Sequence, residues 1–232
     1  MAVSDFSATS AFVVTSARAL VQRTIPFSTF RRVTITIERG SVFAIDKLVA
    51  RLVNLGYAPA GLVIEPGQFS RRGGVLDVFP VTAPFPVRLE FFDDEIDSLR
   101  QFDPATQRTI HHIDSIAITP AREALPELMP PVAAHLRAWF EQAENENVPR
   151  SDFDSLRAGG EFAVMEHYLP YVYTAPASLL DYAPSGTLVI IEDPDEFDLT
   201  LNELVHHRGR DAPARYRRRA AAGGYACPVC LA

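Results

Sequence analysis

Cysteine is scarce in this sequence, and a long uninterrupted apolar run is missing from it. Of the 232 residues only two are cysteine, Cys227 and Cys230, and both lie near the end of the chain. The remainder therefore carries no thiol, which is typical of a reducing compartment, and we expect a cytoplasmic protein. No stretch reaches the ~18 apolar residues that a membrane-spanning helix needs, and Met1–Asp5 lacks the basic start of a secretory signal. We expect neither membrane insertion nor export.

The motifs that hold nucleotides or metal ions are also missing. Glu192 and Asp193 follow an apolar run, as magnesium-binding acids do in nucleoside triphosphatases. No Gly-x-x-x-x-Gly-Lys-Ser/Thr loop accompanies them, so these acids have no bound phosphate to serve. Cys227-Pro-Val-Cys230 supplies only half of the ligands of a closed zinc site. We expect no catalytic residue, no metal and no cofactor.

Charge is distributed unevenly along the chain. His206–Ala232 contains six arginines and one aspartate, which leaves 16 basic and 28 acidic side chains in the rest of the sequence. The rest of the sequence is therefore strongly acidic, and its negative charge repels the phosphate backbones of nucleic acids at long range. A protein partner is favoured over nucleic acid for this reason. We interpret residues 206–232 as a disordered basic tail, with a change of composition typical of a shifted reading frame. A tail that binds nucleic acid is the alternative.

The hydrophobic pattern predicts an α+β domain over residues 32–119. Alternating β-branched residues predict a strand in Val33–Glu38, and apolar spacings of three and four predict an amphipathic helix over residues 45–55. Short links bounded by Gly, Pro or Asp indicate that the strands after this helix pair antiparallel. These strands are predicted at Leu62–Ile64, Phe69–Arg72, Val75–Phe79, Val87–Phe92, Ile96–Phe102 and Ile113–Ile118.

The segments on either side of this domain predict pieces of a second fold. Residues 11–22 predict a short strand followed by a helix, residues 136–142 predict another helix, and Leu188–Asp193 predicts a buried parallel strand. These elements are too few to complete an α/β domain. We therefore interpret residues 1–31 and 120–205 as parts of an incomplete, vestigial helicase-like α/β domain into which the α+β domain is inserted.

A candidate interaction surface follows from the two-residue period of the strand Val87–Phe92. Arg88, Glu90 and Phe92 share one face of this strand, and a hairpin would bring Arg72 to the same face. An aromatic ring beside two guanidinium groups is typical of a protein interface. The alternative is that Phe92 packs under a loop and that Arg88 only pairs with Glu90, and the period alone leaves both open.

Two segments carry a resemblance to a known family. Arg72–Pro80, which reads Arg-Gly-Gly-Val-Leu-Asp-Val-Phe-Pro, and Pro86–Asp103 resemble the transcription-repair coupling factors in order and spacing. The likeness extends more loosely from about Ala11 to Pro194 and corresponds to the UvrB-like module of that family. UvrB itself, which has Gly-Asp in place of Gly73-Gly74 and an active nucleotide site, is the related alternative.

The resemblance implies a function for the domain. In that family this module docks onto UvrA, the damage-recognition ATPase of nucleotide excision repair, after a stalled RNA polymerase has been displaced. By position in the motif, Arg72, Arg88 and Phe92 are similar to its UvrA-contacting residues. RNA polymerase and DNA would be bound only by parts missing from this sequence. We expect a UvrA-recruiting adaptor without turnover; the alternatives are a UvrB-type DNA-dependent ATPase or helicase subunit, and a non-functional gene remnant.

Overall fold

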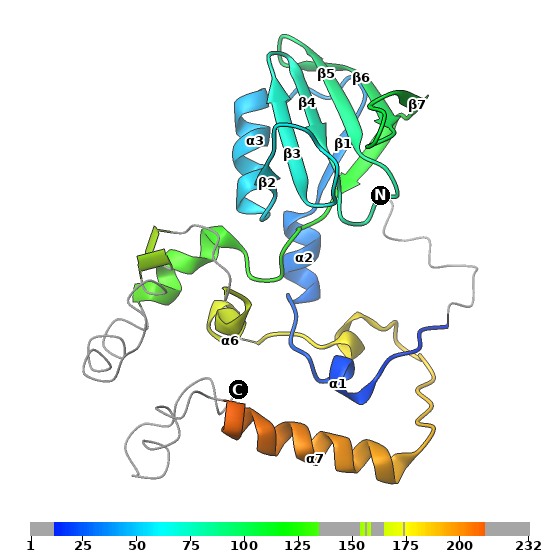
Figure 1. Cartoon of the computed structure of the whole chain (residues 1–232), viewed down its shortest axis with the longest axis vertical. Helices are drawn as coiled ribbons and strands as arrows, with labels where there is room; N and C mark the ends of the chain where they lie inside the picture. Colours follow the sequence, from blue (N-terminus) through cyan, green and yellow to red (C-terminus); the bar gives the residue numbers. More distant parts are fainter. Residues whose placement is uncertain (1–11, 135–153, 156, 159–164, 174, 212–232) are drawn as a thin grey trace. The chain divides into compact units, whose positions relative to one another are not determined.

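The computed structural model describes residues 12–134, 154–155, 157–158, 165–173 and 175–211 (Figure 1). The chain divides into two compact units. The larger is Thr24–Ala177, and the smaller combines Met1–Arg23 with Ser178–Leu231. Each unit is described separately below.

A mixed, largely antiparallel sheet forms the body of the larger unit. It has six strands in the order β2-β3-β4-β5-β6-β7, and we call it the main sheet. Only the β2–β3 pair is parallel. The strands are β2 (Ala58–Pro59), β3 (Gln68–Arg72), β4 (Val75–Val78), β5 (Val87–Phe92), β6 (Glu95–Phe102) and β7 (Thr109–His112). The predicted α+β class is therefore confirmed for this unit.

A second, smaller sheet joins the beginning and the end of this domain. β1 (Ile35–Glu38) pairs antiparallel with β8 (Ser115–Ile118), so that Ile35 lies opposite Ile118. Burial alternates along β1, with Ile35 and Ile37 in the core, as the period of two predicts. Before β1 the chain forms α2 (Phe27–Val33), which begins directly after Pro26, because a proline at a helix start loses no backbone hydrogen bond.

The main hydrophobic core lies between the main sheet and α3 (Ile45–Asn54). The helix buries Leu48 and Leu52 in one cluster with aliphatic residues of β4, β5 and β6. Gly56, with a φ of +83°, allows the chain to leave the helix in a left-handed conformation. The predicted helix and its buried face are confirmed. The face of the sheet that α3 covers is called the inner face, and the opposite one the outer face.

Segments beyond β8 add to the same core. They include η1 (Pro126–Leu128), η3 (Met165–Tyr168) and α6 (Leu169–Val172). Leu125, Met129, Met165, Leu169 and Tyr173 are buried with the residues of α3 and the main sheet. The core therefore extends beyond the boundary at residue 119 that we predicted for the α+β domain, and the domain boundaries stay a prediction.

The described residues of the smaller unit form helices and extended chain. Its described elements are α1 (Ala17–Leu20), η4 (Leu179–Tyr182) and α7 (Pro194–Asp211). None of its described helices, nor any in the larger unit, is long and apolar enough to cross a membrane. α7 extends into the segment that we interpreted as a disordered tail, and residues 212–232, with both cysteines, lie outside the described residues.

Two strands predicted for the smaller unit are wrong. Leu188–Ile191 forms no strand, with Leu188 81% and Ile190 79% exposed, and the extended chain at residues 12–14 is also exposed, Phe12 by 95%. A buried parallel strand needs hydrogen-bonding neighbours and covered faces. The described residues of this unit supply neither, so the apolar runs stay in solvent. The vestigial helicase-like fold remains a proposal.

Smaller differences concern the ends of the main sheet. Leu62–Ile64 is a loop rather than a strand, because the side chain of Gln68 accepts hydrogen bonds from the backbone N–H groups of Ile64 and Glu65 at 2.9 and 3.1 Å. Val63 is buried against Phe79 and Phe102 in a second small core. The predicted last strand, Ile113–Ile118, is confirmed as β8, which pairs with β1 in the smaller sheet, whereas β7 of the main sheet was not predicted. The helix predicted for residues 136–142 lies outside the described residues.

Candidate partner-binding surface

The outer face of the main sheet carries the predicted binding residues. Alternate residues of β4 and β5 point to it, because the residues between them are buried in the core. Arg88 lies opposite Asp77 across the β4–β5 pair. In the next row Val75 lies between Arg72 on β3 and Glu90 on β5. Register therefore brings both arginines to one face in adjacent rows.

A single buried carboxylate joins these two arginines. Asp77 is fully buried, and its two oxygens accept hydrogen bonds from Nε and Nη2 of Arg88 at 2.6 and 2.8 Å. Its Oδ2 also accepts one from Nη2 of Arg72 at 2.8 Å. Hydrogen bonding to Asp77 raises the pKa of the Arg88 guanidinium above its ordinary value, against the opposing effect of burial. Two guanidinium groups on one carboxylate leave this part of the face positively charged.

The arginines differ in what they leave available to a partner. The Arg88 side chain is 19% exposed, and its guanidinium carbon lies 4.8 Å from the centroid of the Phe102 ring. The Arg72 side chain is 53% exposed. Arg88 is therefore held on two sides, by Asp77 and by Phe102, whereas about half of the Arg72 side chain is open to solvent.

Charged side chains of alternating sign form ion pairs across the outer face of the sheet. Arg88 faces Arg100 across the β5–β6 pair, an arrangement of like charges that is unfavourable by itself. Glu90 offsets it, because its carboxylate accepts hydrogen bonds from Arg100 Nη2 and, at 2.7 Å, from Ser98 Oγ. The resulting series across the face is Arg72, Asp77, Arg88, Glu90 and Arg100. Each cation in it has an anionic neighbour.

Phe92 is the last residue of β5. Its side chain is 75% exposed, while the preceding Phe91 packs against the core. The chain then reverses through Asp93, which has a left-handed φ of 54°, into β6. The ring is therefore held in solvent by a regular strand and a tight turn, which is one of the two arrangements that the two-residue period left open.

The glycine pair between β3 and β4 supports the backbone next to Phe92. Gly73 has a φ of +60°, which glycine adopts without strain. The backbone N–H of Phe91 donates to the carbonyl of Gly74 at 2.8 Å. A Cβ on Gly74 would lie 3.2 Å from the carbonyl oxygen of Phe91, closer than an ordinary contact. The Gly-Gly pair thus permits this turn and its close approach to β5.

A β-bulge in β6 keeps the two faces separate near the same turn. Glu90 is opposite Ser98, but the next residue, Phe91, is opposite Ile96, so Asp97 is an additional residue in β6. Without it, Ile96 would point to the outer face. The bulge allows Ile96 to be fully buried while the residues around it remain accessible.

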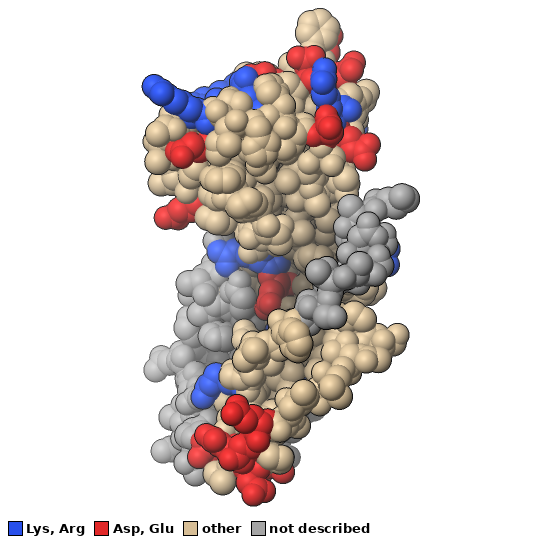
Figure 2. Space-filling model, turned by 90° about the vertical axis from the view of Figure 1, so that its right-hand side faces the viewer, with Lys and Arg blue, Asp and Glu red and all other residues tan. Residues whose placement is uncertain are grey.

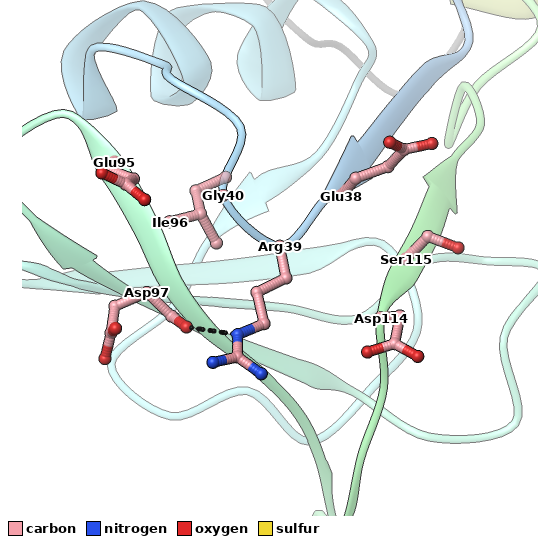
Figure 3. A pocket seen from close by; sticks show the side chains of 8 residues that line it. All are labelled: Glu38, Arg39, Gly40, Glu95, Ile96, Asp97, Asp114 and Ser115. Atoms are coloured by element: carbon pink, nitrogen blue, oxygen red, sulfur yellow. Dashed lines mark hydrogen bonds between the residues drawn. The ribbon is translucent and has the colours of Figure 1, made fainter.

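Charged side chains gather at the end of the domain that is uppermost in Figure 2. Figure 2 shows basic and acidic groups there on either side of a protruding uncharged surface. A polar cleft of about 530 Å³ lies nearby, lined by residues of β1, β6 and the start of β8 (Figure 3). Arg39 projects into it and donates from Nε to the carbonyl of Asp97 at 3.1 Å. Within the described residues no His, Cys, Asp and Glu side chains group in a way that could hold a metal ion.

The structure thus brings together the three residues selected from the sequence and adds one that was missed. Arg72, Arg88 and Phe92 share the outer face, and Arg88 binds Asp77 rather than Glu90. The signal for Asp77 was present in the sequence. It is an acid between two buried aliphatic residues of an alternating strand, and such an acid needs a cation on the neighbouring strand.

Comparison with known proteins identifies a domain family in this part of the chain. A family model described as the UvrB interaction domain matches residues 35–123, which contain both sheets, α3 and the whole candidate surface. The larger unit therefore contains a domain of the UvrB interaction class.

Relatives extend the likeness to most of the chain. The chain is 34% identical over 195 residues to the transcription-repair-coupling factor of Bacillus subtilis. This alignment covers 78% of the chain and 17% of the relative. It is 37% identical over 218 residues to that of Myxococcus xanthus, covering 89% of this chain and 18% of the relative. It is 31% identical over 179 residues to the factor of Escherichia coli, and this alignment covers 77% of this chain and 16% of the relative.

The resemblance inferred from Arg72–Pro80 and Pro86–Asp103 is confirmed: the chain contains a UvrB interaction domain and is similar over most of its length to transcription-repair-coupling factors. It spans less than a fifth of the length of these relatives.

Proposed function

We propose that this chain is a UvrA-binding adaptor module that recruits nucleotide excision repair in the context of transcription. The observation that carries the proposal is the outer face of the main sheet. There Phe92 is 75% exposed, on the same face as two arginines held by one buried carboxylate. Similarity over most of the chain to proteins named for coupling transcription to repair supplies the context.

The proposed contacts divide into two kinds. Phe92 would enter an apolar pocket of UvrA, because a rigid aromatic ring gives a large contact area with little loss of conformational entropy. Arg72 would donate charge-assisted hydrogen bonds to a carboxylate of UvrA from its exposed guanidinium. Arg88, which is mostly covered, would contribute chiefly by holding Asp77 and the charge of the face in place.

In this proposal the chain has no turnover of its own. Its matched domain is an interaction domain, and RNA polymerase and DNA would be bound by other parts of longer family members. An adaptor for DNA repair would act in the cytoplasm. The residues proposed for the site make no use of a nucleotide or a metal ion.

Titration of the purified chain into UvrA, followed by calorimetry, tests the proposal. We expect saturable binding at micromolar or lower concentrations, and the absence of any binding heat or co-migration with UvrA would overturn it. ATP turnover measured in parallel, with and without DNA, addresses the role as an adaptor. DNA-stimulated hydrolysis by this chain alone would favour an ATPase subunit instead.

A further inference from the structure

A segment outside the named strands extends the main sheet beside the turn that carries Phe92. Three backbone hydrogen bonds of 2.7, 2.8 and 3.0 Å join residues 40–43 to the start of β6 and to the turn before it. They hold an antiparallel bridge between Val42 and Glu95. Figure 3 shows this segment passing alongside β6 after Arg39. The backbone of Val42 is therefore positioned as firmly as a strand residue.

Register places Val42 in one row with Phe92. Glu95 pairs with Phe92 on one side and with Val42 on the other. Directly opposed residues of neighbouring strands point to the same face, with Cβ atoms about 5 Å apart. Val42 and Phe92 thus lie on the outer face at roughly twice that spacing, on either side of Glu95.

Exposure distinguishes these two residues from the other apolar side chains of the larger unit. Phe92 is 75% and Val42 is 72% exposed, and the next large apolar side chain described in this unit, Ile64, is 50% exposed. Single exposed apolar residues are common and need no explanation. That the two most exposed ones of the described part of this unit share a row beside the proposed binding residues indicates a common use.

The row also has a defined chemistry. Val42 is β-branched and has little side-chain freedom to lose on binding. Glu95 is exposed between the two apolar groups, and Asp93 and Asp94 precede it in the adjoining turn. This end of the face is therefore apolar with negative charge, whereas the end at Arg72 is positive. A partner that matches both ends has a basic group near Glu95 and an acidic group near Arg72.

We propose that Val42 is a second apolar contact for UvrA and that Glu95 orients the partner by facing a basic group on it. The inference rests on the proposed function and adds to it a second anchor and a direction of docking. The surface would then extend from Arg72 across Phe92 to residues 40–43, beyond the three strands β4, β5 and β6 that the sequence motif covers.

Affinity for UvrA, measured by calorimetry for matched variants of the full chain, tests this inference. We expect Val42→Ser to weaken binding about fivefold or more, and Val42→Thr, which keeps the shape and strand preference of valine, to weaken it in the same direction. Val53→Ser is the matched control, because Val53 is 45% exposed on α3, which covers the inner face. It should bind like the unchanged chain. Glu95→Lys should weaken binding, and more so at low salt.

The outcomes separate the two proposals. If Phe92→Ala and Arg72→Ala weaken binding while Val42→Ser and Val42→Thr bind like the unchanged chain, the second anchor is overturned and the proposed function stands. If the Phe92 and Arg72 variants also bind unchanged, the proposed surface fails, and the second anchor fails with it. A loss in Val42→Ser that Val53→Ser reproduces would likewise overturn the inference. Binding is compared only between variants whose melting temperatures match that of the unchanged chain. If Val42→Ser unfolds, the affinity of Val42→Thr decides whether the second anchor stands.

Discussion

Arg88 donates two hydrogen bonds to Asp77, at 2.6 and 2.8 Å, across the central β4–β5 pair of the main sheet. The carboxylate is fully buried, and its third hydrogen bond comes from Arg72. One side chain thereby sets the positions of both cations on the proposed binding face. The same contact contributes to the stability of the domain, because a buried carboxylate without donors is costly.

We expect Arg88→Ala to lower the free energy of unfolding by about 2–3 kcal/mol, because it removes two of the three donors to a buried carboxylate. Arg72→Ala should cost less than about 1 kcal/mol, since this side chain is largely exposed and Arg88 still pairs with Asp77. Urea denaturation measures both. In a chain that already carries Asp77→Asn, Arg88→Ala should lower the free energy of unfolding by less than it does in the unchanged chain. Equal costs for the two arginine variants would contradict this division of roles.

Phe92→Ala should weaken binding to UvrA and leave the stability of the domain nearly unchanged. Because the ring is exposed, the free energy of unfolding should change by less than about 0.5 kcal/mol. Loss of an aromatic anchor should weaken UvrA binding by about 2 kcal/mol, or roughly 30-fold. Thermal melting and calorimetry of the same preparation check both values. A marked drop in the melting temperature would show that the ring contributes to the core.

The contribution of Arg72 should depend on salt. We expect Arg72→Ala to weaken UvrA binding at low ionic strength and to reduce the steepness with which affinity falls as salt is added, because exposed charges are screened. Arg51→Ala is a suitable control, since Arg51 is an exposed arginine on α3, which covers the inner face. If both variants had the same salt dependence as the unchanged chain, Arg72 would have no direct ionic contact.

Tyr57 should make the domain sensitive to high pH. Burial raises the pKa of its phenol from 10.0 to about 12, against a smaller opposing effect of a hydrogen bond with the Val81 backbone. Its hydroxyl donates to the carbonyl of Thr119 at 2.9 Å. The unfolded chain therefore loses this proton at lower pH than the folded chain, so stability is retained below pH 10 and falls between pH 10 and about 12.

Over that interval the loss should be about 2 kcal/mol, which follows from the difference between the two pKa values. Denaturant midpoints measured at several alkaline pH values test it. Tyr57→Phe should be less stable at neutral pH, because the Thr119 carbonyl loses its donor, but flatter in its dependence on alkaline pH. An unchanged slope in that variant would assign the alkaline loss to other groups.

Local pattern was sufficient for the parts of the fold that depend on near neighbours. The apolar spacing over residues 45–55 predicts α3, and the alternation in Val87–Phe92 places Arg88 and Phe92 on one face, because each period follows from backbone geometry alone. The same reasoning failed for Leu188–Ile191. Whether an apolar run becomes a buried strand depends on neighbouring strands that the run itself does not encode.

The amino-acid sequence by itself indicated the α+β class, the family resemblance and the three candidate residues Arg72, Arg88 and Phe92, since these depend on local periodicity and on a contiguous motif. Only the tertiary structure decided that Asp77 holds both arginines and that Val42 joins the row of Phe92. Those contacts form between segments distant in the chain, and they depend on strand order, register and a bulge. These arise from the packing of the whole domain rather than from any one segment.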